Sequence, residues 1–289
     1  MNDLVESVQN LNLTSRSVRG PKVIGKNEAF LKNLLELAPE FKTWKNQTFD
    51  KPFHLVLAHF PHVTTAYDSS NTSRKNPYYK LKHVFRVENP FILAQYYLKK
   101  VQIGKRNSTV MECNYFHGTK GENLEPICLN NFNWRKVIKG KFGRGVSFSP
   151  RSDYSKHSTR LFNISITPML KNSLLAIKTN EQQFNAMFLC KVLQGKCQGG
   201  APFIKVPQKQ FDTTTNGKGT VFVKYEDFEF YPQYIILMNS AVNPNVVGKK
   251  YNYDDFDEHF DDFDDHFDDF DDHFDDFNYH FDDFDYDFD

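Results

Sequence analysis

The chain has 289 residues and no formal net charge, because 36 Lys and Arg residues balance 36 Asp and Glu residues. The charges are separated along the chain: residues 251–289 hold 19 of the acidic residues and no Lys or Arg, which leaves +19 on the preceding 250 residues. Residues 1–250, called the basic body below, are basic enough to favour polyanionic partners, such as nucleotide phosphates, nucleic acid or the chain's own tail.

No apolar run approaches the roughly 20 residues that span a bilayer. The N-terminal stretch also lacks the basic-then-apolar layout of a secretory signal. The four cysteines form no CxxC pair and have no histidine at zinc-ligand spacing. These features predict an intracellular protein of the nucleus or cytoplasm, with reduced thiols, no membrane partner and no metal site.

Residues 1–24 are polar, which predicts a flexible N-terminus. Residues 27–45 place leucine and phenylalanine near one helical stripe, which indicates an amphipathic helix interrupted at Pro39. The apolar run 53–60 predicts a strand. The Ser-, Thr-, Asn- and Lys-rich stretch 64–79 predicts a loop.

Asn89 and Pro90 are typical of a helix start, with asparagine as the N-cap and proline at the first helical position. Residues 122–129 predict a second, short helix. Strands are expected at residues 113–116, 146–149, 187–193, 221–225 and 234–238. Several strands with few helices, in no regular alternation, predict an α+β fold with antiparallel sheets.

The acidic tail repeats HFDDFDD with a period of seven, and its phenylalanines alternate at spacings of three and four. This spacing matches a coiled-coil seam. Asp is a poor helix former, however, and neighbouring carboxylates would repel one another without lysine. The composition therefore favours a disordered tail, whose four histidines could hold Zn²⁺ or Ni²⁺ only weakly.

The most informative segment is NYFHGTKG, which starts at residue 114. The segments that accompany it are VENPFILAQYYLKK (87–100), NFNWR (131–135), KFGRGVSFSPRSDYS (141–155), MFLCKVLQGK (187–196) and VFVKYEDFEFYPQYII (221–236). In order and spacing they resemble a poly(ADP-ribose) polymerase (PARP) catalytic domain. The likeness is closest to its mono-ADP-ribosylating zinc-finger-antiviral and TCDD-inducible branch, in which an antiviral member with an altered triad is a precedent for an inactive protein.

The resemblance covers roughly residues 80–240 and implies an ADP-ribosyltransferase fold with NAD as co-substrate. Together with the composition of the two ends, it divides the chain into a flexible N-terminus (1–24), a helix-strand-loop lead-in (25–79), a PARP-like catalytic domain (80–245) and a disordered Asp/Phe/His tail (251–289). The fold alone does not establish the activity, which depends on the residues of the site.

The resemblance implies a role for three residues that match the family motif. His117 of the HGT segment would bond the ribose next to nicotinamide. The backbone of Gly118 and the hydroxyl of Ser155 would hold the nicotinamide carboxamide. An amide needs both a hydrogen-bond donor and an acceptor, and such a pair supplies them.

Other positions depart from the family pattern. Ser147 stands where the family has a tyrosine that packs on nicotinamide, and Ser158 stands near a second tyrosine position. Tyr154 and His157 are aromatic residues that could take over this contact. Val221 occupies the place of the glutamate that activates the acceptor hydroxyl in polymerising members. Valine cannot polarise a hydroxyl, so polymer formation is not expected.

Three functions are compatible with this sequence. The first is transfer of single ADP-ribose units from NAD to protein acceptors, with His117, Ser147 and Val221 at the positions of the family triad. The second is a catalytically inactive binding or scaffold protein with the same fold. The third is nucleic-acid binding by the basic body, with the acidic tail as an internal competitor.

Overall fold

The computed structural model describes residues 21–36, 38–44, 47, 49–70, 79–106, 110–175 and 182–240. The chain divides into two compact units, Met1–Ala241 and Val242–Asp289, and all described residues belong to the first. The predicted disordered tail and residues 1–20 of the predicted flexible N-terminus lie outside the described residues. Within the described part, no helix combines the length and the apolar composition that a membrane crossing requires.

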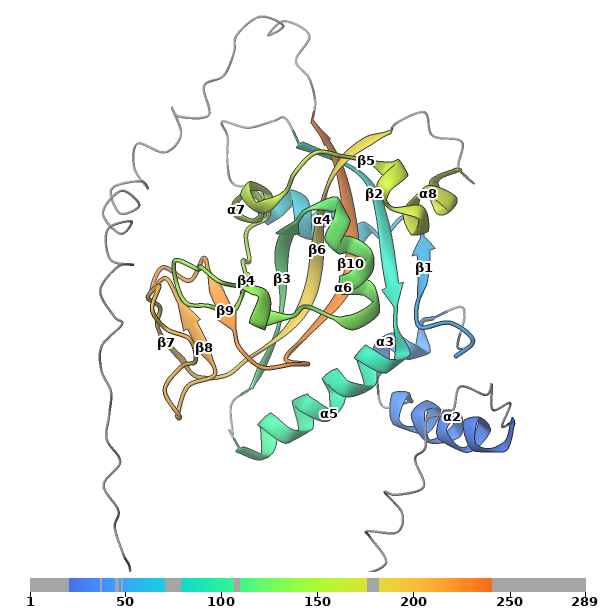
Figure 1. The fold of residues 1–289 in the computed structure, drawn as a ribbon, viewed down its shortest axis with the longest axis horizontal. Helices are drawn as coiled ribbons and strands as arrows, with labels where there is room; N and C mark the ends of the chain where they lie inside the picture. Colours follow the sequence, from blue (N-terminus) through green and yellow to red (C-terminus); the bar gives the residue numbers. More distant parts are fainter. Residues whose placement is uncertain are drawn as a thin grey trace, which may run out of the picture. The chain divides into compact units, whose positions relative to one another are not determined.

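Two sheets form the framework (Figure 1). In the larger sheet the strand order is β1-β2-β10-β6-β3, with the short β5 also paired to β6, and all of its pairs are antiparallel. Its strands are β1 (His54–Leu57), β2 (Tyr79–Glu88), β3 (Met111–Thr119), β5 (Phe162–Asn163), β6 (Gln183–Gln194) and β10 (Phe230–Ser240).

The smaller sheet has the order β4-β9-β8-β7, and only its β7–β8 pair is parallel. Its strands are β4 (Val146–Phe148), β7 (Cys197–Gly199), β8 (Thr213–Thr215) and β9 (Phe222–Lys224). The mixture of antiparallel sheets and scattered helices confirms the predicted α+β class. All five predicted strands after residue 110 are present as β3, β4, β6, β9 and β10.

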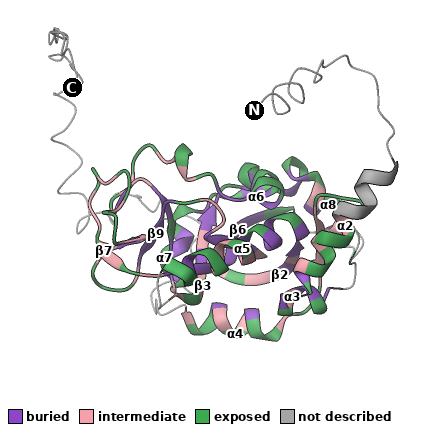
Figure 2. Ribbon diagram, turned by 90° about the horizontal axis from the view of Figure 1, so that it is seen from below, coloured by how far each residue is buried: buried purple, intermediate pink, exposed green. Residues whose placement is uncertain are grey.

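The large sheet is covered on both faces, as alternation along β10 shows. Ile235 and Leu237 join the cluster that contains residues of α6 (Leu124–Asn130) and α8 (Pro168–Leu175). Ile236 joins the cluster of α4 (Pro61–Ser70) on the opposite face. Side chains alternate between the faces of a strand, so one strand contributes to both cores. Figure 2 shows buried residues along the strands and exposed residues on the outer sides of α4 and α6.

Helix α4 corrects the predicted loop at residues 64–79, of which residues 71–78 lie outside the described part. Pro61 begins the helix, where its fixed φ suits the first turn. Val63 and Tyr67, four residues apart, are both buried against the sheet. Tertiary packing therefore outweighs the low helix propensity of the intervening threonines and the terminal serines.

Helix α5 (Pro90–Arg106) starts as the sequence predicts. The side-chain oxygen of Asn89 accepts hydrogen bonds from the backbone N–H groups of Phe91 and Ile92, both at 3.0 Å. This is the N-cap arrangement that satisfies the free donors of a first turn. The predicted amphipathic helix forms in two parts, α2 (Pro21–Leu35) and α3 (Pro39–Lys42), which pack with α5 in a third cluster.

A group of charged side chains joins α3 to the sheet. Lys191 of β6 pairs with Glu40 of α3 and, at 2.6 Å, with Glu112 of β3. The hydroxyl of Tyr97 donates to the second carboxylate oxygen of Glu40 at 2.6 Å. The Lys191 and Glu40 side chains are only 13% and 10% exposed, so Glu40 depends on Lys191 for its counter-charge, whereas Lys191 also has Glu112.

A second charged group lies under the small sheet. Lys224 of β9 is fully buried, and its Nζ lies 2.8 Å from Asp212 and 3.3 Å from Glu229. Burial raises the pKa of Glu229 to about 7, and the opposing attraction of Lys224 does not cancel this effect. Lys224 therefore joins the buried Glu229 and the half-buried Asp212 to β9, the strand that pairs with β4.

The remaining helices are short. They are α7 (Ser152–Ser155) and the 3-10 turns η1 (Gly121–Asn123), η2 (Trp134–Lys136), η3 (Lys156–Ser158) and η4 (Ile164–Ile166). Together η1 and α6 account for the predicted helix at 122–129. Residues of η2, α7 and the earlier helix α6 come together at the end of β3.

Candidate active site

The site is built where β3 meets the chain that leaves β4. Phe116 and Ser149 exchange both backbone hydrogen bonds, at 2.7 and 2.9 Å. The hydroxyl of Ser155, in α7, donates to the Phe116 carbonyl at 3.0 Å. Ser152 fixes the start of α7 because its hydroxyl donates to the carbonyl of Tyr67 in α4. These contacts attach α7 to β3 and bury Ser155 next to the residues that follow Phe116.

Gly118 allows this close approach. A Cβ atom at this position would lie 1.8 Å from the backbone carbonyl oxygen of Ser155 and 3.1 Å from a methyl group of Thr159. The first distance is far shorter than any real contact, so no other residue fits without moving backbone. The absence of a side chain therefore sets the position of Ser155 against β3.

His117 is held in one orientation between two strands. Its Nδ1 lies 2.8 Å from the carbonyl oxygen of Ser147 on β4, and its ring packs edge-on against Phe132 with centroids 4.7 Å apart. Burial lowers the pKa of His117 below its usual value, so the ring is neutral near pH 7. A carbonyl only accepts hydrogen bonds, so Nδ1 carries the proton and Nε2 keeps its lone pair.

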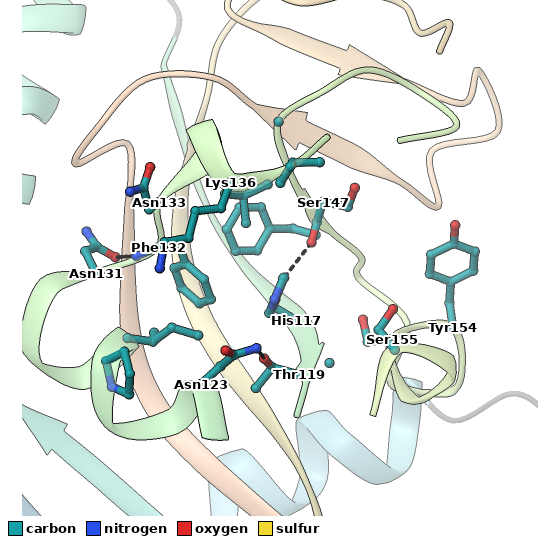
Figure 3. Close-up of a pocket in the computed structure, with 18 residues that line it drawn as sticks. His117, Thr119, Asn123, Asn131, Phe132, Asn133, Lys136, Ser147, Tyr154 and Ser155 are labelled. Carbon is teal, nitrogen blue, oxygen red and sulfur yellow. Dashed lines mark hydrogen bonds between the residues drawn. The ribbon is translucent and has the colours of Figure 1, made fainter. Parts of the chain in front are cut away.

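These residues line a cavity of about 350 Å³. In Figure 3, Asn133 and Lys136 lie on one side of His117, while Tyr154 and Ser155 lie on the other. The lining consists of His117, Gly118, Thr119, Asn123, Pro126, Ile127, Asn131, Phe132, Asn133, Lys136, Val137, Gly145, Val146, Ser147, Phe148, Tyr154, Ser155 and Ser158. The cavity is thus a concave pocket with both apolar walls and polar groups, as small-molecule sites usually are.

Five of the six predicted site residues lie at this cavity: His117, Gly118, Ser147, Tyr154 and Ser155. Their predicted roles in binding stay predictions. Ser158 also lines the cavity, whereas His157, the other aromatic residue considered, is not among the lining residues.

Val221, the sixth residue, is not part of the lining. It is buried in a small cluster with Val223 and Tyr225, packed against Phe142 and Ile204. Its backbone N–H donates to the side chain of Asn216 at 3.3 Å, which closes the turn before β9. Val221 therefore contributes packing to the small sheet and no polar group to the cavity.

The structure adds polar residues that the motif analysis did not single out as site residues. Asn123 lies on η1 and donates to the hydroxyl of Thr119 at 3.2 Å. Asn133 caps η2 by accepting from the N–H of Arg135 at 3.1 Å. Lys136 is the last residue of η2. Their inclusion depends on how η1 and η2 fold back toward β3, and no sequence motif signals this.

Two known proteins are similar to this chain in sequence. The chain is 28% identical over 187 residues to the human protein mono-ADP-ribosyltransferase PARP12. The aligned segment covers 60% of this chain and 24% of that protein. It is 28% identical over 227 residues to mouse protein mono-ADP-ribosyltransferase PARP11, covering 70% of this chain and 65% of that protein. The chain thus matches about a quarter of the length of one relative and just under two thirds of the other.

A comparison with a model of a whole protein family includes the residues of the candidate site. The sequence model described as "Poly(ADP-ribose) polymerase catalytic domain" matches residues 58–228, which include β3, β4, α7 and every residue of the cavity. This match extends over more than half of the chain, and it begins before the expected boundary at residue 80. The chain therefore belongs to the poly(ADP-ribose) polymerase catalytic domain family.

Proposed function

We propose that this protein is an NAD⁺-dependent ADP-ribosyltransferase that transfers single ADP-ribose units to protein acceptors. The observation that carries the proposal is the convergence of His117, Gly118 and Ser155 on one cavity inside a PARP catalytic domain. The chemistry of the lining fits NAD⁺: a backbone segment beside a serine hydroxyl suits a carboxamide, and a neutral imidazole nitrogen suits a ribose hydroxyl.

NAD⁺ supplies the ADP-ribosyl group, with nicotinamide as its leaving group. The residues of this chain bind and orient. Gly118 and Ser155 would hold the carboxamide, and Nε2 of His117, with its lone pair, would accept a hydrogen bond from a ribose hydroxyl. Fixing a substrate in one reactive geometry removes much of the entropic part of a barrier, so a site with few charged groups can still be a catalyst.

The cavity favours transfer of one unit over chain extension. None of its described lining residues is a carboxylate, and Val221 is packed away in the small sheet. A ribose hydroxyl needs a base to become a good nucleophile. The described lining residues include no carboxylate to serve as that base, and Nε2 of His117 is assigned to the ribose of the bound NAD⁺. We therefore propose that a side chain of the acceptor protein is the nucleophile and that no further ADP-ribose units are added to the product.

The test is intact-mass spectrometry of an acceptor protein, or of the chain itself, after incubation with NAD⁺. We expect discrete additions of single ADP-ribose units. His117→Ala is expected to lower the rate roughly 100-fold, because the ring positions the ribose and one positioning side chain typically contributes a factor of this size. Polymer that a polymer-specific glycohydrolase degrades would contradict single-unit transfer. NAD⁺ binding without any product would favour the inactive binding protein.

Ser147→Tyr tests the missing aromatic contact. Ser147 is exposed at the cavity, and a tyrosine there would offer a ring face worth about 0.5–1.5 kcal/mol, or roughly two- to tenfold tighter NAD⁺ binding. Titration calorimetry measures the change. Ser165→Tyr, an exposed position outside the cavity lining, is the matched control and should leave the affinity unchanged. Equal affinity of both variants would indicate that Tyr154 already covers the nicotinamide ring.

The predicted partners and location remain proposals in the same sense. The basic body supports binding of nucleic acid or another polyanion, and the acidic tail would compete for it. We also propose that the protein acts inside the cell, in the nucleus or cytoplasm, as its sequence predicts.

A further inference from the structure

We infer that Lys136 binds the diphosphate of NAD⁺ and so selects dinucleotide over smaller nicotinamide compounds. This inference rests on the proposed function, since it assigns one residue of the cavity to one part of the proposed substrate.

The charges of the lining support the assignment. Lys136 is the one lysine or arginine among the 18 residues that line the cavity, and none of the 18 is Asp or Glu. His117 is neutral, as its contact with the Ser147 carbonyl and its burial indicate. The cavity therefore carries a single positive charge with no carboxylate to offset it, which favours an anionic group near Lys136.

Lys136 is also available for a ligand. Among the described residues, none forms a hydrogen bond or ion pair with its ammonium group. The preceding residue behaves differently: Arg135 forms two hydrogen bonds to Asp227, both at 2.8 Å, and stacks on the Trp134 ring at 4.7 Å. These contacts occupy Arg135 on the outer side of η2, whereas Lys136, which is exposed, makes no such contact with the described residues.

The layout of the cavity matches the length of a dinucleotide. Ser155, which together with Gly118 suits the carboxamide, lies on one side of His117, and Lys136 lies on the other with Asn133 (Figure 3). In NAD⁺ the ribose separates nicotinamide from the diphosphate. A ligand with its carboxamide at Ser155 and its ribose at His117 would direct its phosphates toward Lys136.

The experiment compares ligands that contain the diphosphate with one that lacks it. Binding of NAD⁺, ADP-ribose and nicotinamide to the full chain is measured by titration calorimetry for wild type, Lys136→Gln and Lys136→Arg. We expect Lys136→Gln to bind NAD⁺ and ADP-ribose about tenfold more weakly, as for loss of a charge-assisted hydrogen bond, and to bind nicotinamide as wild type does. Lys136→Arg should restore most of the affinity.

Lys139→Gln is the matched control, because Lys139 is exposed three residues further on and is not among the residues lining the cavity. Unchanged binding of ADP-ribose by Lys136→Gln would overturn the inference and leave the proposed function intact. Equal weakening of nicotinamide and ADP-ribose would also overturn it, since it would indicate general damage to the cavity. A wild-type protein that binds no NAD⁺ would instead contradict the proposed function.

Discussion

Replacing Gly118 with alanine is expected to abolish detectable NAD⁺ binding and to destabilise the domain by roughly 2–4 kcal/mol. The added Cβ would lie 1.8 Å from the Ser155 carbonyl oxygen, and this neighbour is backbone, which cannot rotate away as a side chain can. Relief requires α7 to move from β3. That movement would break the hydrogen bond from the Ser155 hydroxyl to Phe116 and displace the serine from the cavity.

Gly104→Ala is the matched control for this prediction. Gly104 lies within helix α5, and a Cβ there would meet no atom within 4 Å. Alanine is the better helix former, so this variant should be about 0.5–1 kcal/mol more stable than wild type. Urea unfolding and NAD⁺ titration measure both effects. A stable Gly118→Ala protein with normal NAD⁺ affinity would show that α7 is not confined as the structure indicates.

Lys224→Met is expected to destabilise the protein by about 3–5 kcal/mol near pH 8, because it leaves the buried Glu229 and the half-buried Asp212 without their cation. The loss should be smaller at pH 5. Burial raises the folded-state pKa of Glu229 to about 7 from 4.5, so this group disfavours the folded state progressively as pH rises through that window. Without Lys224, which lowers this pKa, the penalty extends to higher pH.

Urea unfolding at pH 5 and pH 8 tests this dependence. Lys99→Met is the comparison, because Lys99 pairs with Glu226, whose side chain is 55% exposed. Pairs with an exposed partner contribute about 1 kcal/mol or less, so that variant should show a small effect at both pH values. An equally large loss for Lys224→Met at pH 5 and pH 8 would indicate that cavity formation, and not the unpaired carboxylates, accounts for the destabilisation.

Local signals in the sequence predicted their elements well. Asn89 and Pro90 specify the start of α5 through contacts within four residues, so the helix start could be predicted without its neighbours. Helix α4 could not be predicted in the same way. Its threonines and terminal serines have low helix propensity, and burial of Val63 and Tyr67 against the distant strands of the sheet stabilises it.

The candidate site also combines residues that local sequence predicts with residues that depend on distant contacts. His117, Gly118 and Ser155 were predicted from a motif whose spacing reflects the close contact between β3 and α7. Val221 was placed at the site by its position in the motif, yet alternation along β9 directs Val221, Val223 and Tyr225 into one packed cluster. Lys136 depends on the fold-back of η2, which the Arg135–Asp227 pair, 92 residues apart, helps to hold. A single sequence does not reveal such distant pairs.

The pairing of Lys191 with Glu40 bears on which shorter fragments of this chain can be studied in isolation. A fragment starting at residue 58, where the family match begins, would lack Glu40 and the α3 residues that pack with α5. Lys191 would keep Glu112, while Tyr97 would lose the acceptor of its hydroxyl. The boundary of sequence similarity is therefore not a boundary of folding, and a stable fragment of this domain should begin ahead of α3.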